Sequence, residues 1–126
     1  MDPRDQARQI GIVDSCLGKF LGTGSAINPG NTTVISSTVA LAGGYYDVTA
    51  FVSVSVAVGL QNAIFRWRNA ADTGDILSQE LYSPGAYFFP LYLKNLPVAV
   101  SEKFQVYVHA TFVGIILGTI IAVRRA

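Results

Sequence analysis

The chain has 126 residues, of which 51% are hydrophobic and only 13% are charged, and its formal net charge is +1. A typical soluble domain carries about 25% charged residues, so we expect much of this surface to be covered by copies of the chain or by a partner. A net charge near zero excludes a general attraction to nucleic acid or anionic lipid. The lone cysteine, Cys16, excludes an intrachain disulfide.

Residues 1–33 are expected to form an irregular N-terminal arm. The opening MDPRDQARQ is polar and lacks an apolar stretch, so we expect no secretory signal. The glycine-rich segment that follows ends in the turn signal Asn28-Pro29-Gly30. Its apolar residues are not typical of a disordered tail, so the arm should lie against another surface. The sequon at Asn31 is interpreted as turn chemistry rather than as a glycosylation site.

From residue 34 onward, the chain predicts short strands separated by glycine, proline and asparagine turns. The expected strands are residues 34–41, 45–58, 63–68, 76–82, 86–93, 103–110 and 115–123. Pro90 indicates an edge strand or a bulge, and Asn95-Leu96-Pro97 is expected to break the chain.

Three of these segments show a period-2 pattern with apolar residues along one side, which is typical of a strand with one buried face. The expected inward residues are Tyr46, Val48, Ala50, Val52, Val54, Val56 and Val58 in the first segment, Phe65 and Trp67 in the second, and Phe104, Val106, Val108 and Ala110 in the third. The lengths and the turn signals together favour an all-β chain.

The C-terminal segment TFVGIILGTIIAVRRA raises the question of a membrane anchor. A spanning helix needs about 20 apolar residues, but Tyr107 and His109 interrupt the run upstream. We therefore expect a strand over residues 115–123, buried on one face by the core and on the other by a neighbouring subunit. Gly114 and Gly118 should mark a bend or bulge, and Arg124-Arg125 should end the strand at solvent or at an acidic patch on a partner.

The strands and turns predict one fold class, an all-β, jelly-roll-like β-sandwich of about eight strands with an irregular N-terminal arm. The arm is placed at residues 1–33 and the sandwich domain at residues 34–126. No long segment with helical periodicity supports an α/β alternative.

Asp72-Thr73-Gly74 is the one motif that matches a catalytic signature, that of aspartic proteases, in which two such aspartates share a proton. The residues before it, RWRNAA, are not an apolar strand, and Asp75 follows directly. We therefore interpret the motif as a polar hairpin turn in which glycine supplies a positive φ. The aspartic hydrolase remains an alternative that would require Asp72 at a dimer axis.

Other chemical sites receive little support from the sequence. A Cys16–His109 nucleophile pair is compositionally possible, and the acidic residues that might surround a cation are Asp47, Asp72, Asp75 and Glu80. Their spacing does not resemble a calcium loop. The chain is therefore expected not to be an enzyme and to have no catalytic residue, cofactor or metal ligand.

Aromatic residues suggest two binding alternatives. Arg66, Trp67 and Arg68 could form a single-strand nucleic-acid surface, but we expect Trp67 to join Phe65 in the core. A second aromatic set could line a carbohydrate site, although such residues are also enriched at subunit contacts. Its members are Tyr82, Tyr87, Phe88, Phe89 and Tyr92.

Three segments carry a family resemblance: GGYYDVTAFVSVS, FRWRNAADTGDIL and PLYLKNLPVAVSEKFQVYVHA. Their order is similar to the strand order of compact viral jelly rolls and of globular heads of the tumour necrosis factor and complement type. The opening G-x-Y-x-V and the late Glu102-Lys103-Phe104-Gln105-Val106 carry this likeness. With few cysteines and an apolar arm, the chain most resembles a bacteriophage head decoration (cement) protein.

The resemblance implies a structural virion protein on the capsid surface, made in the host cytoplasm. It implies a homo-oligomer, with a trimer slightly favoured over a dimer, that bridges major capsid subunits and binds neither nucleic acid nor membrane directly. The alternative that this resemblance leaves open is a receptor- or glycan-binding jelly-roll head of a phage spike or fibre.

Overall fold

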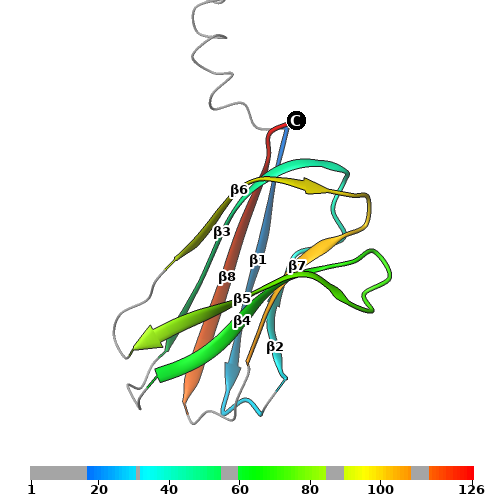
Figure 1. Cartoon of the computed structure of the whole chain (residues 1–126). Helices are drawn as coiled ribbons and strands as arrows, with labels where there is room; N and C mark the ends of the chain where they lie inside the picture. Colours follow the sequence, from blue (N-terminus) through cyan, green and yellow to red (C-terminus); the bar gives the residue numbers. More distant parts are fainter. Residues whose placement is uncertain (1–16, 31, 55–59, 85–89, 109–113) are drawn as a thin grey trace, which may run out of the picture.

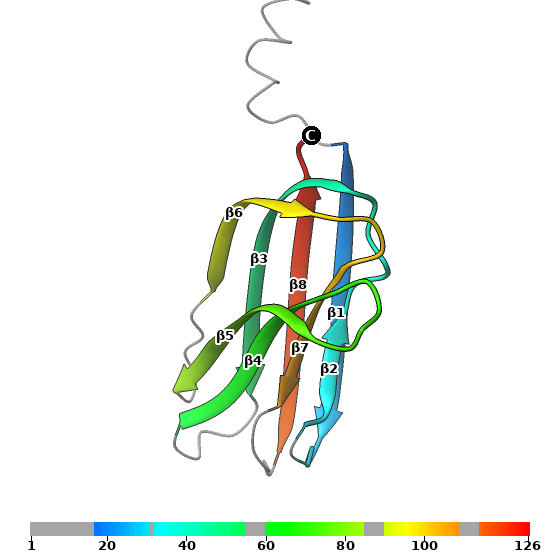
Figure 2. The same cartoon turned by 45° about the vertical axis from the view of Figure 1, so that its right-hand side comes forward.

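The computed structural model describes residues 17–30, 32–54, 60–84, 90–108 and 114–126, with the backbone alone described at 60–62 and 82–84. These residues form two four-stranded antiparallel sheets packed as a sandwich (Figures 1 and 2). The strands are β1 (Gly18–Ile27), β2 (Val34–Ser37), β3 (Gly44–Val54), β4 (Leu60–Arg68), β5 (Asp75–Pro84), β6 (Leu91–Val98), β7 (Lys103–Val108) and β8 (Ile115–Arg124). The expected all-β sandwich is confirmed.

The strand order follows a simple pairing rule. Sheet A has the order β1-β8-β3-β6, and sheet B has the order β2-β7-β4-β5. The first strand pairs with the last, the second with the seventh, the third with the sixth and the fourth with the fifth, all antiparallel. Each connection crosses between the sheets except the β4–β5 hairpin. This arrangement places β8 in the interior of sheet A, between β1 and β3.

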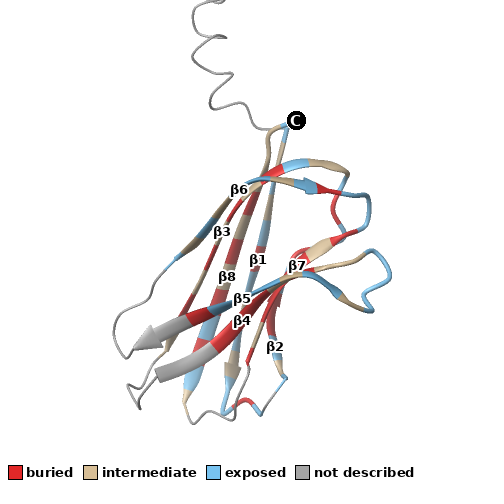
Figure 3. Ribbon diagram, viewed as in Figure 1, coloured by how far each residue is buried: buried red, intermediate tan, exposed pale blue. Residues whose placement is uncertain are grey.

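Aromatic side chains form the centre of the core. The Phe104 ring lies 5.5 Å from that of Phe65, 6.2 Å from that of Trp67 and 6.4 Å from that of Tyr46, measured between ring centroids. All four side chains are buried. Figure 3 shows buried residues on strands of both sheets. The inward faces expected for the three alternating segments are confirmed, because their inward residues from Tyr46 to Val52 and from Phe104 to Val108 are also buried. Val54, at the end of β3, is partly buried against the core. Val56, Val58 and Ala110 lie outside the described residues.

Strand β1 corrects the expected irregular arm. Residues 18–27 pair with β8 in unbroken register, from Gly18 opposite Arg124 to Ile27 opposite Ile115. Irregular structure was expected because glycines stand at inward positions where apolar side chains would reveal the alternation. Residues 1–16, the rest of that expected arm, lie outside the described residues.

The glycines of β1 are required by the approach of β2. A Cβ on Gly24 would overlap the carbonyl oxygen of Ile35, and a Cβ on Gly22 would lie 2.8 Å from the carbonyl carbon of Ser37. Backbone atoms of β2 therefore fill the space that side chains on β1 would need. The contact closes the sandwich at the edge where β1 and β2 meet.

Strand β8 confirms one glycine prediction and corrects another. Gly114 has φ 126° directly before the strand, so the expected bend is present. Gly118 was expected to mark a bend or bulge, but β8 pairs there with Gly24 and Val52 in unbroken register. A Cβ on Gly118 would lie 2.9 Å from the Ser36 hydroxyl oxygen, so glycine serves close packing between the sheets.

Strand β6 runs through the expected break at residues 95–97. Its register against β3 shifts between Tyr46 and Val48, and Asn95 has φ 58°. The turn signal therefore produces a bulge inside the strand instead of ending it. Pro97 is tolerated because β6 is an edge strand of sheet A, and an edge strand can lose a backbone donor without breaking the ladder.

Candidate interaction surface

The outer face of sheet A carries several exposed apolar side chains. Alternation along the strands turns every second residue of sheet A outward. We define the sheet-A face by these outward residues: Leu21, Thr23, Ser25, Ile27, Thr49, Phe51, Ser53, Tyr92, Ile115, Leu117, Thr119 and Ile121. The side chains of Leu21, Leu117 and Tyr92 are at least half exposed, at 58%, 50% and 54%. Exposed contiguous apolar surface of this kind is typical of interaction sites.

The structure confirms the expectation for the C-terminal strand on one of its two sides. One side of β8 is buried by the core, with Ile116 and Ile120 at 1% and 0% exposure. On the other side, Ile115 and Leu117 are exposed, at 40% and 50%. Burial of this second side by a neighbouring subunit therefore stays a prediction.

Charged residues at the outward positions of sheet A gather at one end. Lys19 and Asp47 flank Val123 in the same row across β1, β8 and β3, and Lys94 follows nearby on β6. The Arg125 Nε donates to Asp47 Oδ2 at 3.1 Å, so the end of the chain binds an acidic group within its own sheet. The sheet-A face, as defined above, excludes this charged row and holds only apolar residues, serines and threonines.

The outer face of sheet B has a different chemistry. The Arg66 guanidinium lies 4.1 Å from the centroid of the Tyr107 ring, and its Nη2 donates to Gln105 Oε1 at 3.0 Å. Arg68 and Lys103 lie at the end of the same face. A partner that covered this face would have to desolvate several charges, whereas a partner on the sheet-A face would not.

Asp72-Thr73-Gly74 lies in the β4–β5 hairpin, as the sequence predicts. Asp72 Oδ1 accepts from Arg68 Nε at 2.8 Å, and Asp72 Oδ2 lies 3.0 Å from Lys103 Nζ. The hydrogen bond from Arg68 holds the pKa of this carboxyl below its usual range, with Lys103 contributing in the same direction. The positive φ belongs to Asp72, at 56°, and not to Gly74, so that detail of the prediction was wrong.

The other candidate residues do not form a described site. Asp47 lies on sheet A, while Arg68 binds both Asp72 and Asp75 in the hairpin. Within the described ranges, no three His, Cys, Asp or Glu side chains lie close enough together to hold a metal ion. Cys16 and His109 lie outside the described residues, as do Tyr87, Phe88, Phe89 and the side chain of Tyr82.

Trp67 is part of the core, which confirms the prediction made for it. Its side chain is 6% exposed, and its Nε1 donates to Glu102 Oε1 at 3.1 Å. The same carboxylate oxygen accepts from the backbone of Ala99 at 2.7 Å. Glu102 therefore connects β4 to the turn between β6 and β7, and the indole face is not available for stacking on a base.

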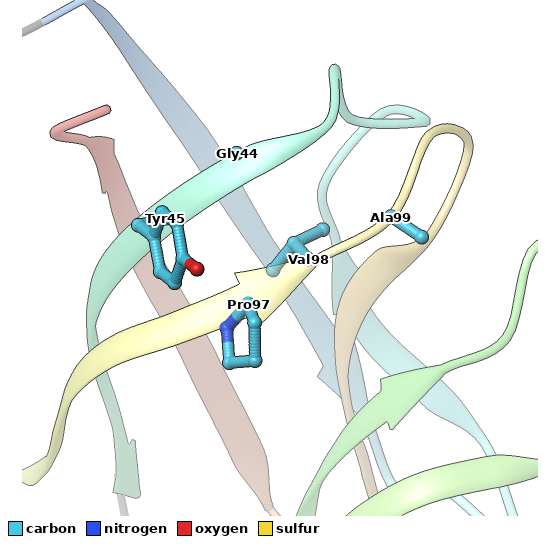
Figure 4. A pocket seen from close by; sticks show the side chains of 5 residues that line it. All are labelled: Gly44, Tyr45, Pro97, Val98 and Ala99. Atoms are coloured by element: carbon cyan, nitrogen blue, oxygen red, sulfur yellow. The ribbon is translucent and has the colours of Figure 1, made fainter.

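A shallow hollow of about 230 Å³ lies at one end of sheet A, beside the paired strands β3 and β6. Figure 4 shows the rings of Tyr45 and Pro97 near each other on neighbouring strands, with Val98 and Ala99 beyond them. Its lining residues, which also include Gly44, carry no charged or nucleophilic side chain. The hollow is therefore suited to contact with a flat apolar group.

Sequence reasoning missed the contribution of β1 to the sheet-A face. Leu21 and Ile27 lie within the segment expected to be irregular, although both are exposed and outward. The available signal was period-2 alternation with glycine on the inward side, from Phe20 to Ala26.

The carboxylate of Asp47 is expected to make stability depend on acid pH. The backbone N–H of Asn95 donates to Oδ1 at 3.0 Å, and this bond, followed by the Arg125 contact, lowers the pKa of Asp47 below its usual 3.8. Because the folded-state pKa lies below the unfolded one, the stabilisation is present above pH 3.8 and lost as pH falls through the folded pKa. In urea unfolding, Asp47→Asn should have a free energy of unfolding about 1 kcal/mol lower than that of the unmodified protein at neutral pH, and this difference should shrink in acid. An equal loss at every pH would contradict this.

Comparison with known proteins does not assign a family to the chain. No family model matches the chain, and no curated protein is significantly similar to it. No helix in the described part of the chain is long and apolar enough to cross a bilayer.

Proposed function

We propose that the protein is a structural virion protein, a capsid decoration or cement protein that self-associates and bridges major capsid subunits. The observation that carries this proposal is the uncharged, exposed sheet-A face, which is suited to a permanent protein contact. Stable subunit contacts are enriched in apolar and aromatic residues and depleted in charge at their centres.

The strand order supports the proposal. The first strand pairs with the last, the second with the seventh, and so on inward. This pairing results when one long antiparallel ribbon is rolled into two sheets. We infer that this is a jelly roll, an architecture used by viral capsid and lectin domains. Because one fold serves many functions, the fold alone does not decide between them.

The proposed mechanism is mechanical. An oligomer that contacts neighbouring capsid subunits makes their separation more costly when the shell expands against internal pressure. Each contact can be modest, because binding at several symmetric positions at once multiplies the individual affinities. The low fraction of charged residues is consistent with a surface that is largely covered in the assembled particle.

The test is co-sedimentation of the purified full chain with expanded capsids of the virus that encodes it. We expect saturable binding at a fixed ratio to the major capsid protein, and capsids that survive higher temperature when decorated. No association with the capsid would overturn the proposal. Specific binding on a glycan array, without capsid binding, would instead support the spike or fibre alternative, for which exposed Tyr92 and the Tyr45–Pro97 hollow would supply the aromatic surface.

A further inference from the structure

We propose that the sheet-A face is an isologous dimer interface, on which a second copy of the chain packs face to face. This inference deepens the proposed function and rests on its self-association, because it names the surface and the partner. In an isologous contact, the same patch of both copies meets about a two-fold axis. The sheet-A face is suited to this arrangement because it has no charged side chain that a copy would have to complement.

The uncharged rows set the size of the contact. Sheet A has four strands about 4.8 Å apart, and the rows from Ile115 to Ile121 span seven residues at about 3.3 Å each, so their overlap covers about 450 Å². Two copies would together bury about 900 Å², which falls in the range of weak, reversible associations. Two sheets packed face to face also interdigitate their side chains at a spacing of about 10 Å, as in a sandwich core.

The opposite outer face of the sandwich is a poor partner for the sheet-A face. A head-to-tail contact of the sheet-A face with sheet B would bury Arg66 and Arg68 against apolar side chains. Arg68 already binds Asp72 and Asp75, and covering this network would desolvate charges without adding new partners. Contact between two sheet-A faces avoids this cost, which favours a second copy in the symmetric orientation.

The charged end of sheet A selects the direction of the two-fold axis. With the axis parallel to the strands, Lys19 of one copy would lie near Lys94 of the other, because the strand order is reversed across the contact. The alternative axis also lies in the plane between the two sheets but runs perpendicular to the strands. In that arrangement, the charged ends of the two copies point in opposite directions and remain at the rim. The uncharged rows from Ile115 to Ile121 then overlap, so the axis crosses β8 between Leu117 and Thr119.

A matched pair of variants tests the surface. Leu117 and Ile76 are exposed to nearly the same extent, at 50% and 47%, but Leu117 lies on the sheet-A face and Ile76 lies on β5 of sheet B. In sedimentation velocity of the full chain, we expect the unmodified protein and Ile76→Lys to be dimers. Leu117→Lys should weaken dimerisation by about 30-fold or more, since a lysine is buried near the axis.

The outcomes separate this inference from the proposed function. An unmodified monomer, or an unaltered dimer in both Leu117→Lys and Leu21→Lys, would overturn the dimer interface; thermal unfolding of each variant checks that it is folded. A dimer that does not bind capsids would overturn the decoration function and leave the interface standing. Capsid binding by a folded monomeric Leu117→Lys protein would support the function through another surface.

Crosslinking tests the axis. In a Cys16→Ser background, single cysteines are introduced as Thr119→Cys, near the axis, and as Lys19→Cys and Lys94→Cys, at the charged end. A short bismaleimide should join two Thr119→Cys copies, and in an equimolar mixture it should not join a Lys19→Cys copy to a Lys94→Cys copy. Efficient crosslinking of Lys19→Cys to Lys94→Cys would overturn the perpendicular two-fold arrangement.

Discussion

Replacing Ile120 with aspartate is expected to abolish folding of the sandwich. Ile120 is fully buried on β8, and its register partners on either side are Gly22 of β1 and Ala50 of β3. A carboxylate at this position would lie among the apolar side chains of the core cluster, which come from both sheets. The cost is expected to exceed about 4 kcal/mol, a large part of the 5–15 kcal/mol that stabilises a typical domain.

The measurement is the soluble yield of Ile120→Asp together with its circular dichroism and thermal unfolding. Ile120→Val is the conservative control and should cost about 0.5–1.5 kcal/mol, because it removes one methylene group and leaves a small void. Ile76→Asp is the exposed control and should unfold near the temperature of the unmodified protein. If Ile120→Asp unfolded at a similar temperature, β8 would not be a buried strand of sheet A.

Replacing Gly24 with alanine is expected to cost about 2–3 kcal/mol, although only one methyl group is added. The new Cβ would overlap the backbone carbonyl of Ile35, and a backbone atom cannot move aside as a flexible side chain does. Relief would require β1 or β2 to shift, which would strain the edge where the two sheets meet. Overpacking of this kind typically costs 1–3 kcal/mol.

Gly30→Ala is the matched control for Gly24→Ala, since no atom of the described residues beyond its chain neighbours lies within 4 Å of the position that its Cβ would occupy. The free energy of unfolding, measured by urea denaturation, should fall strongly for Gly24→Ala. For Gly30→Ala it should change by no more than about 0.5 kcal/mol. Equal shifts would indicate that the loss comes from a general backbone effect rather than from contact between β1 and β2.

Much of the fold could be predicted from local pattern alone. Period-2 alternation identified the strands around Tyr46, Phe65 and Phe104 and the side of each that is buried, because successive side chains of a strand point to opposite faces. The hairpin at Asp72 was predicted for a similar reason, since Asp, Thr and Gly are typical of turns. These features depend on residues close together in the chain.

Features that depend on contacts between distant segments could not be predicted in this way. β1 was missed because glycine is required at positions 22 and 24 by the close approach of the β2 backbone. Their neighbours in sequence give no sign of that contact. The same type of contact explains Gly118, which was expected at a bulge and lies in a regular strand against Ser36. A glycine signal alone does not distinguish a turn from a close approach of two strands.

The sequence by itself determined the all-β class, most of the strands and their inward sides, because alternation and turn chemistry are local. Only the tertiary structure decided that the first strand pairs with the last, and that β8 is buried on one side and exposed on the other. An apolar run such as IILGTIIAV specifies that both of its sides avoid water, but it does not specify what covers each side. The strand order supplies the core for one side and leaves the sheet-A face exposed.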